Sequence, residues 1–219
     1  MEATVQPRVI SVNVGRPRTV EAHGRTFATA IFKEPVAGRR RVAGVNVEGD
    51  RQADLRVHGG LSKSLYAYAI EDYRWWEREI GRELGPGTFG DNVTVEGVDL
   101  AAAVIGERWE VGAAVLRVTE PRIPCYKLGV RMDDRRFPAR FAAAARPGTY
   151  LAVERPGDIG AGDVIRRVDR PAHGVTIGTI ERAYHHDRAL ARRLLDVTEL
   201  SDGWRAWAHK AVQARARPA

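Results

Sequence analysis

The only cysteine of the chain, Cys125, lies in the segment Pro121-Arg122-Ile123-Pro124-Cys125-Tyr126-Lys127. Arg122 and Lys127 place positive charge near the thiol, and neighbouring cations lower the pKa of a cysteine. The thiolate is the form that attacks electrophiles and binds soft metals. Two prolines in five residues predict a rigid loop. Because most free cysteines are small buried hydrophobes, these residues alone leave a reactive thiol and a core side chain as equal alternatives.

Two glycine-rich segments upstream could also carry chemistry. Residues 49–60 end in Val57-His58-Gly59-Gly60, where consecutive backbone N–H groups could bind an anion. Residues 87–93 offer the hydroxyl of Thr88 and the carboxamide of Asn92 at the start of a strand. Taken alone, each segment is also an ordinary turn, and such a histidine is more often structural than catalytic.

The composition sets limits on the class of protein. The chain has 219 residues, of which 44% are hydrophobic and 29% charged, and its net charge is +7. A single cysteine excludes an intrachain disulfide, a multi-cysteine zinc site and an iron–sulfur cluster. We find neither a signal-peptide pattern nor an apolar run near the roughly 20 residues of a membrane helix, so we expect a soluble cytoplasmic protein. The positive charge suits an anionic ligand but does not identify it.

The elements that must position these segments are mostly short strands. Apolar and β-branched runs bounded by glycine or proline predict strands over 9–14, 41–47, 92–95, 108–111, 114–118 and 150–153. This spacing favours a barrel or sandwich. Apolar residues at spacings of three and four predict one helix over 70–84, stopped by Gly85-Pro86-Gly87, with Tyr73 and Trp76 on its core stripe.

The C-terminal part of the chain has a different pattern. After Pro171 three apolar stripes predict three helices, the last of them capped by Ser201 and carrying Trp204 and Trp207. We therefore predict a mainly β fold with peripheral helices over residues 1–172, followed by a small three-helix bundle over 173–219. Such a bundle is too small to be secure alone and should dock on the barrel.

The ordered set of motifs resembles the MOSC family, named after the C-terminal domain of molybdenum cofactor sulfurases, and in particular its bacterial YiiM-type branch. That branch carries Val-His-Gly-Gly, an aromatic-rich helix, Phe-Gly-Glu-Asn and Pro-Arg-x-Pro-Cys in this order. Here they stand at 57–60, 73–76, 89–92 and 121–125. The C-terminal helices resemble a small three-helix domain of the same proteins, so the likeness covers nearly the whole chain.

The resemblance implies a β-barrel that binds the molybdenum pyranopterin cofactor, with Cys125 as the metal ligand and catalytic residue. Residues near the pterin or its phosphate would be Lys33, Arg56, His58, Thr88, Asn92 and Arg122. The implied activity is reduction of small N-hydroxylated bases or similar compounds, with electrons from an external flavin reductase or ferredoxin. We expect no membrane and no specific nucleic acid as partner, and leave a homodimer open.

Two departures from the branch pattern and two alternative functions accompany this prediction. Asp91 replaces the usual glutamate, and Leu61-Ser62-Lys63 replaces a segment that usually holds proline and aspartate. Cys125 could instead carry a persulfide or deliver sulfur or cofactor to another enzyme. A basic nucleic-acid-binding module is the remaining alternative, which strong salt-dependent binding would reveal.

Overall fold

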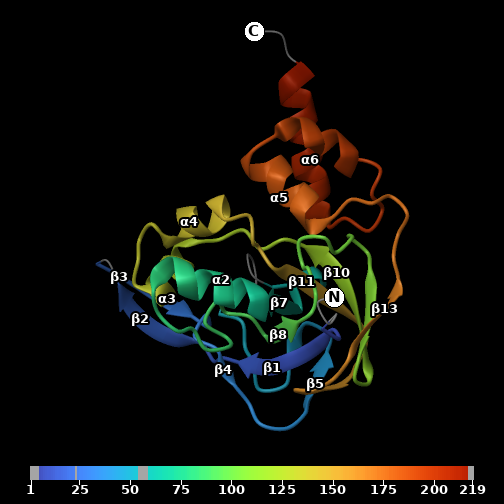
Figure 1. Ribbon diagram of the computed structural model, residues 1–219. Helices are drawn as coiled ribbons and strands as arrows, with labels where there is room; N and C mark the ends of the chain where they lie inside the picture. Colours follow the sequence, from blue (N-terminus) through green and yellow to red (C-terminus); the bar gives the residue numbers. More distant parts are fainter. Residues whose placement is uncertain (1–4, 23, 54–58, 217–219) are drawn as a thin grey trace.

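The computed structural model describes residues 5–22, 24–53 and 59–216. In these ranges the largest element is a mixed eight-stranded sheet that curls into a half-barrel (Figure 1). Its strands, in spatial order, are β13 (Ile165–Asp169), β9 (Arg108–Val111), β10 (Ala114–Glu120), β11 (Thr149–Arg155), β7 (Leu65–Ala69), β8 (Val93–Glu96), β1 (Arg8–Val14) and β4 (Glu34–Pro35). Neighbouring strands are antiparallel except β7 and β8, which are parallel. The prediction of a mainly β domain with helices is confirmed, in the form of a curled half-barrel.

Two smaller β units flank the main sheet. Strands β12 (Gly157–Ile159), β5 (Arg40–Ala43) and β6 (Asn46–Val47) form one sheet, and β2 (Arg18–Ala22) and β3 (Arg25–Thr29) form a separate hairpin. The single strand predicted over 41–47 is thus two strands, because Gly44 adopts a φ of 57° and turns the chain between them. The hairpin was not predicted, since its residues are mostly exposed and show no clear apolar alternation.

Helix α2 (Ile70–Ile80) crosses over between the parallel strands β7 and β8 (Figure 1). Tyr73 and Trp76 are fully buried, as the apolar stripe predicts. The helix is shorter than the predicted range 70–84, because Gly81 adopts the left-handed conformation and its N–H donates to the carbonyl of Glu77 at 2.9 Å. Leu84 lies beyond the helix but is still buried.

Strand β7 separates two hydrophobic clusters, because successive side chains of a strand point to opposite faces. Leu65, Ala67 and Ala69 pack into the main core, whereas Tyr66 and Tyr68 pack on the other side. The buried residues of this second side, here called the aromatic cluster, are Tyr66, Tyr68, Tyr73, Trp76, Leu84, Phe89, Leu128, Met132, Phe137 and Phe141. The aromatic cluster supports the pocket described below.

Two short helices, α3 (Tyr126–Met132) and α4 (Phe137–Ala143), follow the cysteine loop. They were not predicted, because seven residues span about two turns and give little periodicity to detect. Leu128 and Met132 of α3 and Phe137 and Phe141 of α4 belong to the aromatic cluster. Packing of these side chains therefore fixes where the cysteine loop ends.

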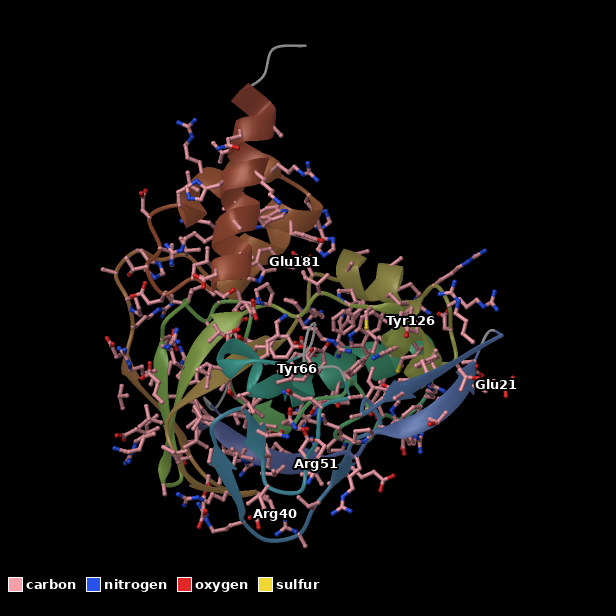
Figure 2. The ribbon with its side chains drawn as sticks, turned by 180° about the vertical axis from the view of Figure 1, so that it is seen from behind. Glu21, Arg40, Arg51, Tyr66, Tyr126 and Glu181 are labelled. Atoms are coloured by element: carbon pink, nitrogen blue, oxygen red, sulfur yellow. The ribbon has the colours of Figure 1, made fainter. Side chains whose placement is uncertain are left out.

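The C-terminal segment holds α5 (Ile177–His185), the 3₁₀ helix η2 (Arg188–Leu194) and α6 (Asp202–Ala216). The middle element, predicted as a helix, is thus 3₁₀ in type. Ser201 precedes α6 as predicted, but its hydroxyl donates to Glu120 Oε2 at 3.0 Å. These elements lie over one end of the sheet in both views (Figure 1 and Figure 2), and Leu194 and Ala208 join the main core. The boundary at residue 172 stays a prediction.

Within the described ranges, no helix combines the length and apolar character that crossing a membrane requires.

Candidate functional site

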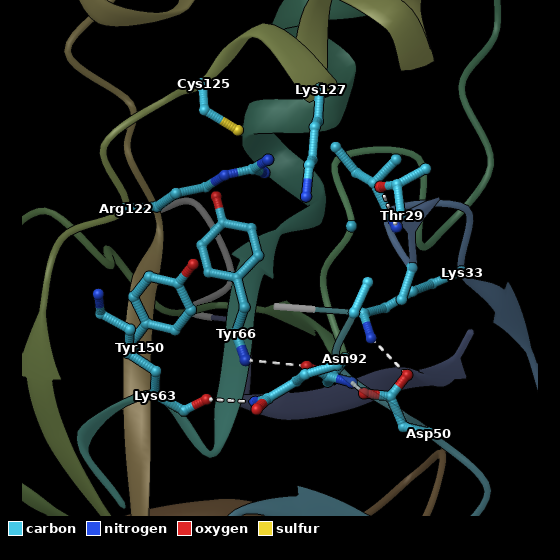
Figure 3. A pocket seen from close by; sticks show the side chains of 15 residues that line it. Thr29, Lys33, Asp50, Lys63, Tyr66, Asn92, Arg122, Cys125, Lys127 and Tyr150 are labelled. Carbon is cyan, nitrogen blue, oxygen red and sulfur yellow. Dashed lines mark hydrogen bonds and ion pairs between the residues drawn. The ribbon is translucent and has the colours of Figure 1, made fainter. Parts of the chain in front are cut away.

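A pocket of about 650 Å³, counting its open mouth, lies beside the cysteine loop. Four of the predicted site residues line it: Lys33, Asn92, Arg122 and Cys125 (Figure 3). They come from three separate segments of the chain, because Arg122 and Cys125 belong to the same loop. Thr88 does not line this pocket, and Arg56 and His58 lie outside the described residues. The fold thus brings together most of the predicted residues that it describes.

Cys125 lies at the end of the loop that leaves β10, and α3 begins at the next residue. It is partly exposed and has no disulfide partner, so it is not a core side chain. Its sulfur points toward the space between Arg122 and Lys127 (Figure 3). The loop therefore presents the thiol to a positively charged pocket, which favours a reactive thiol over a core side chain.

Arg122 is buried, with 7% of its surface exposed. Its guanidinium carbon lies 5.0 Å from the ring centroid of Tyr66, and the group donates to the carbonyl of Phe89. Among the described residues, no carboxylate forms an ion pair with it. Burial opposes the charge, but Tyr66, Tyr150 and Cys125 together raise the pKa of Arg122. A buried cation held by rings and a carbonyl attracts an anionic ligand.

A hydrogen-bonded network forms the opposite side of the pocket. The Asn92 side chain accepts from the N–H of Tyr66 at 3.2 Å and donates to Asp50 Oδ2 at 3.0 Å (Figure 3). Asp50 Oδ1 accepts from the N–H of Gly15 at 2.7 Å and from Lys33 Nζ. Burial lowers the pKa of Lys33, and Asp50 opposes that shift. Asn92 is therefore a scaffold between β7 and the Asp50 turn, with its amide at the pocket wall.

Thr88 and Asp91 support the site from behind. The Thr88 hydroxyl donates to the carbonyl of Gly85 at 2.6 Å, so it stabilises the turn that carries Phe89. Asp91 is completely buried and accepts from Tyr73 Oη at 2.6 Å and Thr94 Oγ1 at 2.7 Å. Burial raises the pKa of Asp91. The Asp91 carboxylate, one methylene shorter than the usual glutamate, therefore bonds to side chains inside the protein.

Several lining residues were not predicted as site residues, among them Asp50, Gln52, Lys63, Tyr66, Lys127 and Tyr150. In the sequence, Lys127 stands out only for its charge. Asp50 follows Gly49 in a turn, and nothing in that turn distinguishes a ligand-facing carboxylate from an exposed one. Burial raises the pKa of Tyr150 to about 12, so its hydroxyl keeps its proton near neutral pH. Among the described residues, four cationic side chains and one carboxylate line the pocket, so this part of its lining is positively charged.

Comparison with known proteins decides the family. The model of the MOSC domain matches residues 54–166, just over half of the chain, and this range includes Cys125. The chain belongs to the MOSC family. It is 32% identical over 201 residues to the uncharacterized protein YflK of Bacillus subtilis, covering 90% of this chain and 91% of that one. It is 29% identical over 191 residues to the protein YiiM of Escherichia coli, covering 84% and 85% respectively.

Two further relatives are similar to this chain along most of its length. The crystal structure of YiiM from Geobacillus stearothermophilus superposes with a TM-score of 0.79 at 28% identity, covering 94% of this chain and 99% of that chain. A protein named reductase from Gibberella moniliformis is 28% identical over 202 residues, which are 90% of this chain but only 36% of that protein. This chain therefore matches only about a third of that longer protein.

The pocket residues fit the cofactor that the family name suggests. Anionic phosphate and oxo groups need cations, and Arg122 offers one that no described carboxylate neutralises. A metal that prefers soft ligands needs a thiolate, which Cys125 can supply. A pterin ring carries N–H groups, and Gln52 Oε1, on the same lining, is buried without a donor among the described residues. Each requirement is met by a different residue of the same pocket.

Proposed function

We propose that this protein binds the molybdenum pyranopterin cofactor in the pocket beside Cys125 and reduces small N-hydroxylated compounds. The observation that carries the proposal is that one pocket is lined by a partly exposed thiol and by a buried arginine that pairs with no carboxylate among the described residues. A thiol alone suits many reactions, and an arginine alone suits many anions. Together they suit a ligand that contains both a soft metal and anionic groups.

The residues of the chain would act on this ligand as follows. Arg122, held over Tyr66, would bind an anionic oxygen, and Lys127 would add positive charge at the same side. Cys125 would ligate the metal as a thiolate, and Gln52 would accept from a ring N–H. Lys33 would stay paired with Asp50, so that its role is to hold the pocket wall. When bound, the cofactor supplies two-electron oxygen-atom transfer chemistry.

The electron balance requires a partner. Reduction of an N–OH group to N–H consumes two electrons and two protons and releases one water. With a single cysteine, this chain has no iron–sulfur site of its own, so the electrons would come from an external flavin or iron–sulfur reductase. The reductase name of one relative, which is far longer than this chain, supports this class of reaction.

Metal content tests the proposal directly. The purified protein should contain about one molybdenum and one pterin per chain, and Cys125→Ala should lose the metal while keeping its circular dichroism spectrum. Arg131→Ala is a suitable control, because Arg131 contacts Phe32 and Thr88 and does not line the pocket. Turnover of an N-hydroxylated base with a reduced viologen dye as electron source would complete the test.

Either of two results would contradict the proposal. Protein that is isolated without molybdenum, and that cannot be loaded with the cofactor, excludes the cofactor site. Metal-free protein that accepts and passes on a sulfur atom at Cys125 would show instead a sulfur carrier.

A further inference from the structure

A second pocket lies on the other side of the cysteine loop. It measures about 890 Å³ with its open mouth, and it shares Lys63, Cys125 and Tyr150 with the first pocket. Its remaining lining comes from the end of β10, from the cysteine loop and from helices α5 and α6. Because Cys125 belongs to both pockets, a molecule in the second pocket lies next to whatever the thiol holds in the first.

Aromatic side chains of the C-terminal helices form one wall of this second pocket. The rings of Tyr184, Trp204 and Trp207 lie within 5.5 Å of one another, centroid to centroid. Trp204 is buried, but Tyr184 keeps 38% of its surface exposed and Trp207 is half-buried. Aromatic surface that remains exposed at a concave site is typical of a ligand pocket, and it favours flat ring systems that can stack or pack edge to face.

A buried carboxylate, Glu120, lies in the same pocket. It is only 3% exposed, and its oxygens accept from Ser62 Oγ at 3.3 Å and from Ser201 Oγ at 3.0 Å. Lys63 Nζ lies 3.8 Å from the carboxylate. A carboxylate has about four acceptor positions, so these contacts leave capacity for a further N–H donor. Ser201 immediately precedes α6, so Glu120 also positions the helix that carries Trp204 and Trp207.

We propose that this second pocket is the substrate subsite, and that it selects a planar aromatic ring bearing N–H groups. Trp207 and Tyr184 would pack against the ring, Glu120 would accept from its N–H group, and Cys125 would mark the boundary with the cofactor. The claim that the bound ring is a substrate rests on the proposed function. The claim that the pocket binds such a ring does not. It gives the C-terminal helices a role in substrate selection that neither the fold nor the cofactor pocket requires.

Binding and kinetics of Trp207 variants test the assignment. Adenine serves as the planar probe and cyclohexylamine as the non-planar one, with dissociation constants measured by calorimetry on the purified full-length protein. Because Trp207→Ala removes one base–aromatic contact, it should raise the adenine dissociation constant about tenfold, which is about 1.4 kcal/mol. Trp207→Phe should restore most of the affinity. In turnover assays, Trp207→Ala should raise KM by the same factor and leave kcat nearly unchanged.

The chain supplies a matched control and a second variant. Trp75 is also a partly buried tryptophan, but it lies on α2 against Trp76 and Arg146 and lines neither pocket. Trp75→Ala should therefore leave adenine binding unchanged. If Trp207→Ala fails to fold, Tyr184→Ala provides the same test, because Tyr184 is exposed and its removal should not disturb the core.

The outcomes separate this inference from the proposed function. Adenine binding that survives both Trp207→Ala and Tyr184→Ala overturns the subsite, as does equal affinity for cyclohexylamine. Adenine binding that depends on Trp207, in a protein without reductase activity, supports the subsite and refutes the proposed reaction. Reductase activity with KM unchanged in both variants supports the reaction and refutes the subsite.

Discussion

The guanidinium of Arg122 lies over the ring of Tyr66 at 5.0 Å and donates to the carbonyl of Phe89. These two contacts connect the cysteine loop to the aromatic cluster through Tyr66 and to the turn after Thr88 through Phe89. It also holds a positive charge inside the protein next to Cys125. An arginine held by rings and a carbonyl keeps the donors that face the pocket available to an anion.

Arg122→Ala should release the cofactor and leave the fold intact. The variant loses the anion-binding group, while the unpaired carbonyl of Phe89 costs about 1–3 kcal/mol of stability. Molybdenum and extracted pterin, measured per chain, should fall to background. Arg122→Lys keeps the positive charge but lacks the planar guanidinium, so it should retain part of the molybdenum and pterin content. Unchanged cofactor content in Arg122→Ala would refute the assignment.

The pair formed by Lys33 and Asp50 should contribute to stability as a unit. Both side chains are buried, and removing one partner leaves the other as an uncompensated buried charge. Lys33→Met should therefore reduce the free energy of unfolding by about 3 kcal/mol. In the double variant with Asp50→Asn, part of this loss should be recovered, giving a coupling energy of about 1–3 kcal/mol in urea unfolding. Strictly additive losses would show that the two groups act independently.

Gly87 should be far less tolerant of substitution than Gly85, two residues away. Gly87 has a φ of +84°, and a Cβ there would come 2.7 Å from the carbonyl oxygen of Lys33. Gly87→Ala should therefore reduce the free energy of unfolding by about 2 kcal/mol or more and lower the melting temperature by roughly 4–8 °C. A Cβ on Gly85 meets no atom within 4 Å, so Gly85→Ala should melt close to the wild type. Equal melting temperatures for the two variants would contradict this account.

The buried carboxyl of Asp91 should make stability fall as pH rises through its pKa. Burial raises the pKa of Asp91 in the folded protein above the ordinary 3.8. At pH values between the unfolded and the folded pKa, the native state therefore binds more protons than the unfolded state. In that window the free energy of unfolding decreases with rising pH. Asp91→Asn lacks this titration, so the wild type should lose stability relative to the variant as pH rises. Urea unfolding across roughly pH 3.5–8, which begins near the ordinary carboxyl pKa and extends well above it, measures the difference. Parallel curves would show that Asp91 does not titrate there.

The order of the motifs along the chain was sufficient to predict its family. The pattern of short apolar runs was sufficient to predict its mainly β character. The crossover helix could also be predicted, because Tyr73 and Trp76 recur at helical spacing. Its end could not, because Gly81 and Gly85-Pro86-Gly87 are both good stop signals and packing selects the first. The hairpin of β2 and β3 and the helices after Cys125 carry too little periodicity to be read from the sequence.

The chemistry of the site depends on contacts between residues that are far apart in the chain. The sequence alone shows that one thiol lies between an arginine and a lysine, and this holds for any fold. That Asp50 pairs with Lys33 and Asn92, and that Glu120 and Trp207 reach the other side of Cys125, follows only from folding. The physical reason is that local sequence determines residue types and short-range geometry, whereas burial, charge compensation and pocket shape arise from packing between distant segments.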